Sequence, residues 1–288
     1  MSQPSIEEYV SVRRLGKANV TLVSEGILPW PPDLQAPEEE WRAAMPEADE
    51  DGAIPLGVHT ALIQLGNATV IIDPGYDDPG SPWDARFAAE TPGMQRTSGL
   101  TTALAGLGVL PESVTHVLIT HTHGDHFCGV TRHENDMLVA RYPNARHVIG
   151  RGDWDNNPER DDPASDLAQR LGLIDRLGLL NLVDVEAEVA PGVAMLPAPG
   201  ETAGHSIVRV RSEGSAFFYL GDLYHHSCEV AHPGWVPANR DPVAMQASRE
   251  RLTTEAVPSD ATLVFTHEHF PPWGRIVVSG SGHRWERG

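Results

Sequence analysis

Short apolar runs, separated by glycine, proline and acidic residues, recur along the chain from residue 19 onward. Runs of this length that are rich in valine, isoleucine and aromatic residues are typical of buried strands. We expect strands at 19–26, 59–66, 68–75, 115–120, 146–150, 182–187, 193–199, 206–212, 216–222 and 261–266. The turn at Asn67 predicts a hairpin between the second and third of these, and the segment 274–285 closes the chain.

Helical spacing interrupts the strands in several places. Leu100, Leu104 and Leu107 lie on one face of a helix predicted over 99–109. Further helices are predicted within 162–180 and over 241–256. Strands and helices are therefore mixed within two similar halves. This order favours an α/β fold in which two mixed sheets pack on each other with helices outside, and we expect one domain over residues 1–288.

One segment, residues 26–56, departs from this pattern because it is rich in proline and acid. The prolines exclude a continuous helix, although EEEWRAAM has the composition for about two turns. Long connections of this kind often serve binding, so we expect an arm or a cover over a site, or a subunit contact. A disordered tether is the alternative, given the low hydrophobicity.

The composition of the chain limits the classes of binding partner that we expect. The net charge of the 288-residue chain is −19. Lys17 is the only lysine in the sequence, so arginine supplies almost all of the positive charge. Such a surface repels phosphate backbones and anionic lipid, so we expect no nucleic acid and no membrane as partners. No apolar run reaches 18 residues, and the first residues lack the pattern of a secretory signal, so a cytoplasmic location is expected. Cys128 and Cys228 are expected to be reduced thiols. The oligomeric state is open, with a homodimer as one option.

The main chemical signal is the stretch VLITHTHGDHFCG. His121, His123, Asp125 and His126 directly follow a predicted buried strand. Nitrogen and carboxylate donors so close together suit Zn²⁺, with Mn, Fe or Co as alternatives. In extended backbone His121 and His123 point to the same side, and Gly124 allows the chain to turn before the other two donors.

Four donors are too few for two ions, so further ligands are expected from distant segments. His205 ends PAPGETAGH, where glycines allow a close approach of the loop. Asp222 follows the apolar run AFFYLG, and His267 follows ATLVFT. A lone carboxylate at the end of a buried strand needs a partner, which a metal would supply.

The order HTHGDH, TAGH, GD and a late histidine resembles the metallo-β-lactamase superfamily, over nearly the whole chain from Asn19. The resemblance implies a four-layer αβ/βα sandwich with a dinuclear centre at one edge of the two sheets. By position it assigns the ligands of one ion to His121, His123 and His205, those of the other to Asp125, His126 and His267, and a bridging role to Asp222. It also implies that Asp73 orients the ligand loop.

Within the superfamily, GDLYHH and HEHFPPWGRI look most like the branch of methyl parathion hydrolase and the N-acyl-homoserine lactonases. Lactonases have a tyrosine three residues after the bridging aspartate. Here that position is His225, and Tyr224 is displaced by one residue. Either side chain is a candidate donor to a developing oxyanion, and Asp125 is a candidate for proton transfer as well as ligation.

Two bound ions imply a hydroxide nucleophile, and the acidic chain favours a small, neutral, partly apolar ester or lactone as substrate. A phosphotriester is the main alternative. A diiron redox protein of the same fold and a binding module without metals are the alternatives from other classes.

Overall fold

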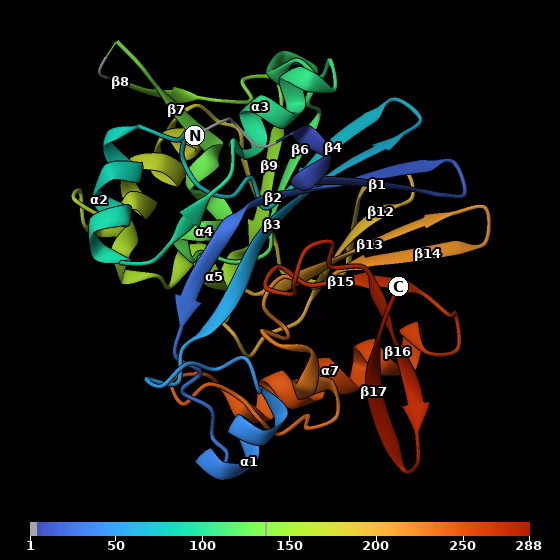
Figure 1. The fold of residues 1–288 in the computed structure, drawn as a ribbon. Helices are drawn as coiled ribbons and strands as arrows, with labels where there is room; N and C mark the ends of the chain where they lie inside the picture. Colours follow the sequence, from blue (N-terminus) through green and yellow to red (C-terminus); the bar gives the residue numbers. More distant parts are fainter. Residues whose placement is uncertain (1–4, 136) are drawn as a thin grey trace.

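A computed structural model describes residues 5–135 and 137–288 and shows two large sheets packed on each other (Figure 1). The first sheet is eight-stranded and has the order β1-β2-β3-β4-β6-β9-β10, with β5 paired to β2. Its strands are β1 (Val10–Leu15), β2 (Ala18–Trp30), β3 (Ile54–Leu65), β4 (Ala68–Ile72), β5 (Gln95–Arg96), β6 (His116–Ile119), β9 (Arg146–Gly150) and β10 (Leu180–Val183).

The second sheet is seven-stranded, and its strands follow in sequence order. They are β11 (Ala187–Ala190), β12 (Val193–Pro197), β13 (Ser206–Ser212), β14 (Ser215–Tyr219), β15 (Thr262–Val264), β16 (Gly274–Ser279) and β17 (Gly282–Arg287). A separate hairpin joins β7 (Thr131–Glu134) to β8 (Met137–Ala140).

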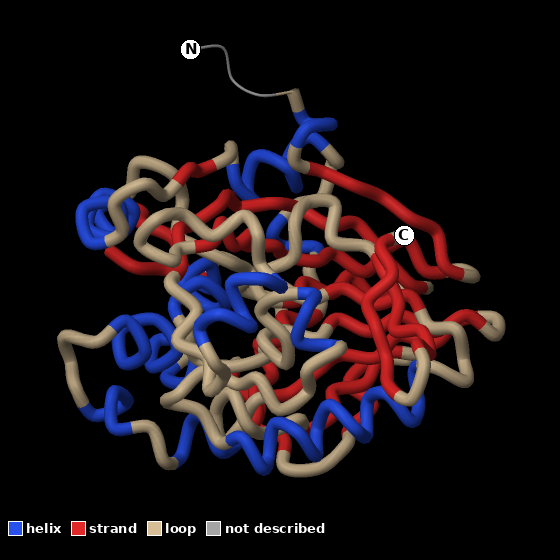
Figure 2. Tube along the Cα trace, turned by 60° about the horizontal axis from the view of Figure 1, so that its bottom comes forward, coloured by secondary structure: helices blue, strands red, loops and turns tan. Residues whose placement is uncertain are grey.

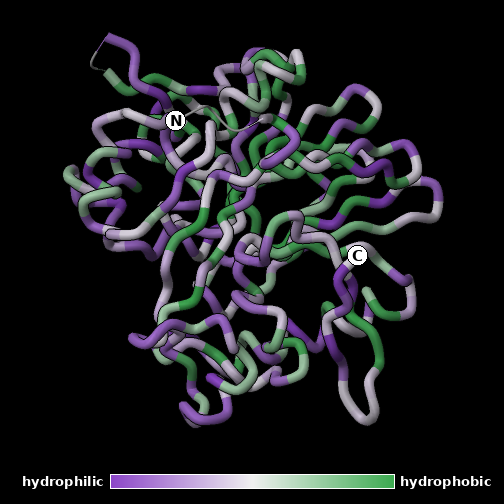
Figure 3. Tube along the Cα trace, in the orientation of Figure 1, coloured by the Kyte–Doolittle hydropathy of each residue, from purple (hydrophilic) through white to green (hydrophobic). Residues whose placement is uncertain are grey.

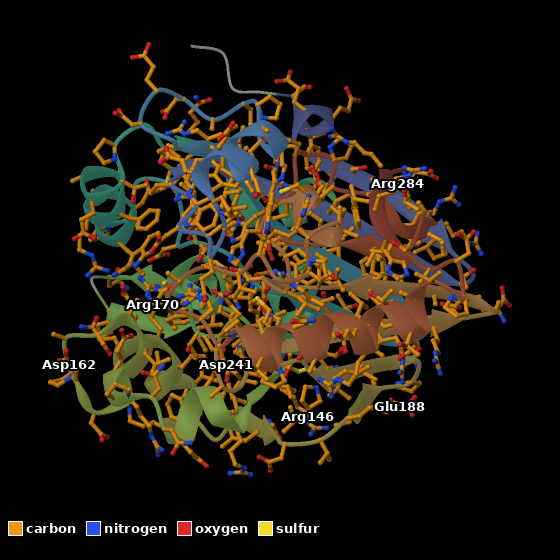
Figure 4. All side chains as sticks on the ribbon, turned by 90° about the horizontal axis from the view of Figure 1, so that it is seen from below. Arg146, Asp162, Arg170, Glu188, Asp241 and Arg284 are labelled. Carbon is orange, nitrogen blue, oxygen red and sulfur yellow. The ribbon has the colours of Figure 1, made fainter. Side chains whose placement is uncertain are left out.

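Helices lie along the outer flanks of the strands (Figure 2). The α-helices are α1 (Glu38–Ala44), α2 (Pro82–Glu90), α3 (Gly99–Gly106), α4 (Gly124–Phe127), α5 (Arg151–Asp155), α6 (Gly172–Arg176) and α7 (Pro242–Ala256). A π-helical turn, η5 (Leu167–Leu171), leads into α6. Short 3₁₀ turns are η1 (Ile6–Glu8), η2 (Pro111–Ser113), η3 (Cys128–Val130), η4 (Pro158–Asp161) and η6 (Ser227–Val230). Asp241, labelled in Figure 4, begins α7 by accepting hydrogen bonds from the backbone N–H groups of Val243 and Ala244.

The alternation of side chains along the strands builds the layers. In β4, Val70 and Ile72 face the core between the sheets, whereas Ile71 faces the helices that cover the first sheet. Hydrophobic residues accordingly run along the central strands, and polar residues gather toward the hairpin tips (Figure 3). The outer face of the second sheet packs on α7 through Leu252 and Ala256. The predicted four-layer sandwich of two mixed sheets with flanking helices is confirmed.

Most predicted elements are present, and α7 and β13 nearly match their predicted bounds. The predicted strand 182–187 is wrong. The chain leaves the first sheet after Val183 and enters the second at Ala187. The three residues between them, two of them bends, carry the crossing from one sheet to the other, and the apolar content of LVDVEA concealed that break.

The proline- and acid-rich segment is ordered by packing. Its first residues extend β2 to Trp30, its last ones begin β3, and EEEWRAA forms the predicted two-turn helix as α1. Trp41 and Met45 are buried in a cluster with Ile54 and Trp235. The segment is therefore folded against the loops that follow β14, which the low hydrophobicity did not suggest.

Among the helices of the described residues, none has the length and apolar content that crossing a membrane would require.

Candidate metal centre

The histidine motif begins where β6 ends. His121 is fully buried at the strand terminus, and α4 carries Asp125 and His126 on the next turn of chain. The side chain of His123 is 36% exposed, so it lies at the edge of the centre. His121 Nε2 and His123 Nδ1 are 2.8 Å apart, which shows that the two imidazoles converge as expected for extended backbone.

The distant candidates reach the same place from the second sheet. Asp222 follows β14 and His267 follows β15, and these two strands are parallel neighbours. Their carboxyl ends therefore meet at one edge. The loop that ends in His205 is held there because the backbone N–H of Ser206 donates to the carbonyl of Thr120, which precedes the motif.

The converging side chains include two groups of possible metal ligands. Within each group, the donor atoms lie within 4.8 Å of one another. The first group contains His121, His123, Glu201 and Asp222, and the second contains Asp125, His126 and His267. Asp222 also reaches the second group: its Oδ2 is 3.1 Å from His267 Nε2, and its Oδ1 is 3.3 Å from His126 Nε2. The carboxylate of Asp222 thus lies between the two groups.

His205 belongs to neither group, but it lies beside the first. Its ring centroid is 5.2 Å from that of His121, and its Nε2 is 3.2 Å from the backbone nitrogen of Asp222.

Several imidazoles are fixed through the nitrogen that points away from the centre. The contacts of Nδ1 are His126 with Asp73 at 2.8 Å, His205 with the carbonyl of Ala198 at 2.9 Å, and His267 with the carbonyl of Gly57 at 2.7 Å. Such contacts favour a proton on Nδ1, as in a metal-binding histidine. The Nε2 atoms of His126 and His267 then face the centre, whereas Nε2 of His205 accepts from the backbone N–H of Asp222.

The centre also contains buried polar atoms with no hydrogen-bond partner among the described residues. They include His126 Nε2, Asp222 Oδ1 and Glu201 Oε2. An orphaned buried donor or acceptor is costly, and a missing ion is one of its ordinary explanations. The donor set and the orphaned atoms therefore fit two metal ions.

The pKa shifts of His121 and Asp222 agree with this reading of those two donors. Burial, together with the neighbouring His126, lowers the pKa of His121 well below its ordinary value, so His121 is a neutral donor. Burial opposes a charge on Asp222 as well, but the surrounding imidazoles outweigh it and hold the pKa of Asp222 well below its usual range. Asp222 is therefore an ionised carboxylate, as a bridging ligand must be.

His225 faces the centre from the loop after β14. Its Nε2 is 3.7 Å from Asp222 Oδ2 and 3.6 Å from Glu201 Oε2. The ring lies between two aromatic planes, with Trp30 at 5.1 Å and His267 at 5.7 Å between centroids. Burial opposes protonation, but Glu201 outweighs it and raises the pKa of His225 to about 9.

Tyr224 lies elsewhere, which argues against the catalytic role predicted for it. Its ring packs in the cluster beneath α7, 6.2 Å from Phe265, and the Arg249 guanidinium lies over it at 4.6 Å. Burial raises the pKa of the phenol to about 12. The turn after β14 sends adjacent side chains to opposite sides, so His225 and Tyr224 cannot both face the centre.

Glu201 and Arg240 were not among the residues predicted from the sequence. Glu201 lies in the same loop as His205, and its Oε1 accepts a hydrogen bond of 2.6 Å from Arg240 Nε. Its signal was a single acid in PAPGETAGH, four residues before a candidate ligand. An acid in a loop is usually solvated, so no sequence pattern predicts that this one lies inside the protein.

A four-layer sandwich with imidazole and carboxylate donors converging at one edge of its sheets defines a metalloprotein with places for two ions. The profile of the Metallo-beta-lactamase superfamily matches residues 53–267. The chain belongs to this superfamily, and the resemblance noted in the sequence is confirmed.

Its homologues are metallo-hydrolases and lactonases. A probable metallo-hydrolase of Mycobacterium tuberculosis is 24% identical over 60% of this chain, which spans 58% of that protein's length. The N-acyl homoserine lactonase AttM of Rhizobium radiobacter is 27% identical, covering 74% of this chain and 78% of AttM. The solved structure of AidC, a dizinc quorum-quenching lactonase with the product N-hexanoyl-L-homoserine, superposes with a TM-score of 0.75 at 20% identity and covers 97% of each chain.

Proposed function

We propose that this protein is a metal-dependent hydrolase that holds two Zn²⁺ ions and cleaves a small, neutral, partly apolar ester or lactone. The observation that carries the proposal is the carboxylate of Asp222 between two groups of buried donors. In the proposed assignment one ion takes His121, His123 and His205, the other takes Asp125, His126 and His267, and Asp222 bridges them. Mn, Fe or Co in place of zinc would satisfy the same donors.

Two bound divalent ions would supply a hydroxide at neutral pH, because metal binding lowers the pKa of water from 15.7 to about 7. The protein's own residues then hold and orient the substrate. His225, fixed between Trp30 and His267, is the proposed donor to the oxygen that gains charge during attack. Asp125 is the proposed proton carrier, since its carboxylate is partly exposed while it faces His126 and His267.

The neutral substrate is supported by charge and by the walls of the centre. A chain of net charge −19 repels a carboxylate or a phosphate monoester on approach. Trp30 reaches His225 from the segment 26–56, and Glu47 of the same segment is 2.8 Å from His226. We therefore propose that this segment is a cover that provides an apolar wall, within a single domain. The likeness to lactonases supports lactones as the first of the candidate esters.

A phosphotriester remains the second candidate, because His225 stands three residues after Asp222, as in methyl parathion hydrolase, and the structure has it facing the centre. A diiron redox protein would be recognised by visible absorption of the purified protein.

Elemental analysis tests the centre, and close to two transition-metal ions per chain are expected. A single metal ion per chain in fully active protein would refute the dinuclear assignment. Substrate class is tested by comparing kcat/KM for a neutral lactone, a neutral aryl ester, a phosphotriester and an anionic thioester. The lactone or the aryl ester should be best, and a clear preference for the anionic thioester would overturn the electrostatic argument.

A further inference from the structure

Glu201 is an acidic side chain inside the centre that the superfamily resemblance leaves without a role. Its side chain is 0% exposed, and the loop that carries it connects β12 and β13. Glu201 Oε1 lies 3.4 Å from His123 Nδ1, and the four donors of the first group lie within 4.8 Å of one another. A buried carboxylate in this position needs a positive partner.

Arg240 satisfies only one of the two carboxylate oxygens of Glu201. Its Nε donates to Oε1 at 2.6 Å, so one carboxylate oxygen is satisfied. The other oxygen, Oε2, is buried and has no hydrogen-bond partner among the described residues. His225 Nε2, at 3.6 Å from Oε2, is beyond hydrogen-bonding distance, although it is close enough to form an ion pair with that oxygen.

The orphaned state of Oε2 has a parallel in the same centre. His126 Nε2 and Asp222 Oδ1 are also buried and unpartnered, and both are proposed metal ligands. Glu201 accepts from arginine through Oε1, the oxygen that also lies 3.4 Å from His123 Nδ1, and its carboxylate keeps a second, unpartnered oxygen. A metal-binding carboxylate usually has such an additional contact beside the metal. The same argument that identifies His126 and Asp222 therefore applies to Glu201.

We propose that Glu201 is a further metal ligand, binding through its carboxylate the ion held by His121 and His123, with Arg240 as its positioning residue. The inference rests on the proposed dinuclear centre. It gives this ion five protein donors, namely His121, His123, His205, Asp222 and Glu201. Structural and catalytic zinc sites in proteins have three or four protein ligands. The two positions would therefore differ, and the first would suit a metal that accepts five or six ligands, such as Mn, Fe or Co.

The test compares metal binding by the wild type and by Glu201→Gln. The amide keeps the volume and can still accept from Arg240, but it removes the charge. Both proteins are stripped, reloaded with Co²⁺ and titrated with a chelator, and visible spectra are recorded at each step. Glu47→Gln is the matched control, since this glutamate also contacts a histidine, His226, but lies outside both donor groups.

The wild type should bind two ions, and Glu201→Gln should lose affinity for one of them by at least about tenfold. Its cobalt absorption should also intensify, because a centre with fewer ligands moves toward tetrahedral geometry. The control should match the wild type. His225→Ala should keep both affinities, which separates ligation from an ion pair between Glu201 and His225.

Unchanged affinities and an unchanged spectrum in Glu201→Gln would overturn the role of Glu201 and leave the dinuclear centre standing. Fewer than two ions in the wild type would instead refute the proposed function. If Glu201→Gln does not fold, a crystal structure of the metal-loaded wild type decides. A Glu201 oxygen at about 2.0–2.2 Å from the ion supports ligation, and one beyond about 3 Å overturns it.

Discussion

Asp73 offers a test of how the protein prepares a ligand without touching the metal. Its buried carboxylate accepts three hydrogen bonds, from the backbone N–H of Thr120 at 2.7 Å, from the Thr120 hydroxyl at 2.7 Å, and from His126 Nδ1 at 2.8 Å. The last of these holds the proton of His126 on Nδ1 and so leaves Nε2 available as a donor. Asp73→Asn removes this control while changing the shape of the side chain very little.

Asparagine also suits the backbone at this position. Asp73 has a φ of 48°, in the left-handed region where asparagine and aspartate are tolerated better than most residues. Any effect of Asp73→Asn should therefore come from the hydrogen bonds. If the amide oxygen stays on the Thr120 N–H, the amide N–H₂ faces His126 Nδ1 and places the histidine proton on Nε2, where the metal should bind.

One charge-assisted hydrogen bond contributes about 1.5–3 kcal/mol, which corresponds to about 10–100-fold in metal affinity. Chelator competition on the reloaded protein should show this loss for the ion bound by His126. The value of kcat/KM should fall at limiting metal and recover in excess metal. Asp78→Asn, which removes the charge of a partly exposed acid beside Arg141, is the matched control. The reasoning is refuted if folded Asp73→Asn holds both ions as tightly as the wild type.

Two further predictions concern stability. Burial, against the opposing charge of Arg96, raises the pKa of Glu25 from 4.5 to about 7, so the folded state binds more protons than the unfolded state between these values. Urea unfolding should show about 3 kcal/mol lost as pH rises through this window, and Glu25→Gln should abolish that slope; an equal slope in the variant would contradict the assignment. Asp77→Ala should lower the free energy of unfolding by about 3–5 kcal/mol, because it removes the carboxylate 2.8 Å from buried Arg170 (Figure 4) and leaves the longer contact with the carboxylate of Asp166 at 3.3 Å. The exposed Glu90→Ala should change it by less than about 0.5 kcal/mol, and similar values for the two variants would refute the prediction.

The sequence predicted the fold well where apolar periodicity and burial coincide. The central strands are covered on both faces, so β6 and β9 appear as short continuous apolar runs with clear limits. The pattern failed at 182–187 because a crossing between two sheets contains apolar residues on both sides of the bend. It also concealed the end of β2, since prolines at the edge of a sheet are compatible with strands as well as with loops.

The candidate site was predictable to the extent that its residues follow strands. His121, Asp222 and His267 share that position. Parallel pairing of β14 and β15 brings Asp222 and His267 together, and the packing of the two sheets brings His121 to them. Side-chain direction in the turn after β14 was not predictable, because neither period of regular structure applies there. His225 and Tyr224 were therefore equivalent in the sequence, although the structure separates them.

The role of Glu201 could not be predicted from the sequence pattern, and the reason is physical. A loop acid is recognised as a ligand only when its environment is known, since burial, the Arg240 contact and the orphaned oxygen all arise from tertiary structure. The same environment explains why the centre depends on its ions. Carboxylates and imidazoles packed in the interior lose solvation, and their mutual contacts leave several atoms unpartnered. Metal binding would satisfy those atoms and add its free energy to folding. The two sheets hold the donors of such a centre in place, and bound metal ions would supply the partners that these donors lack.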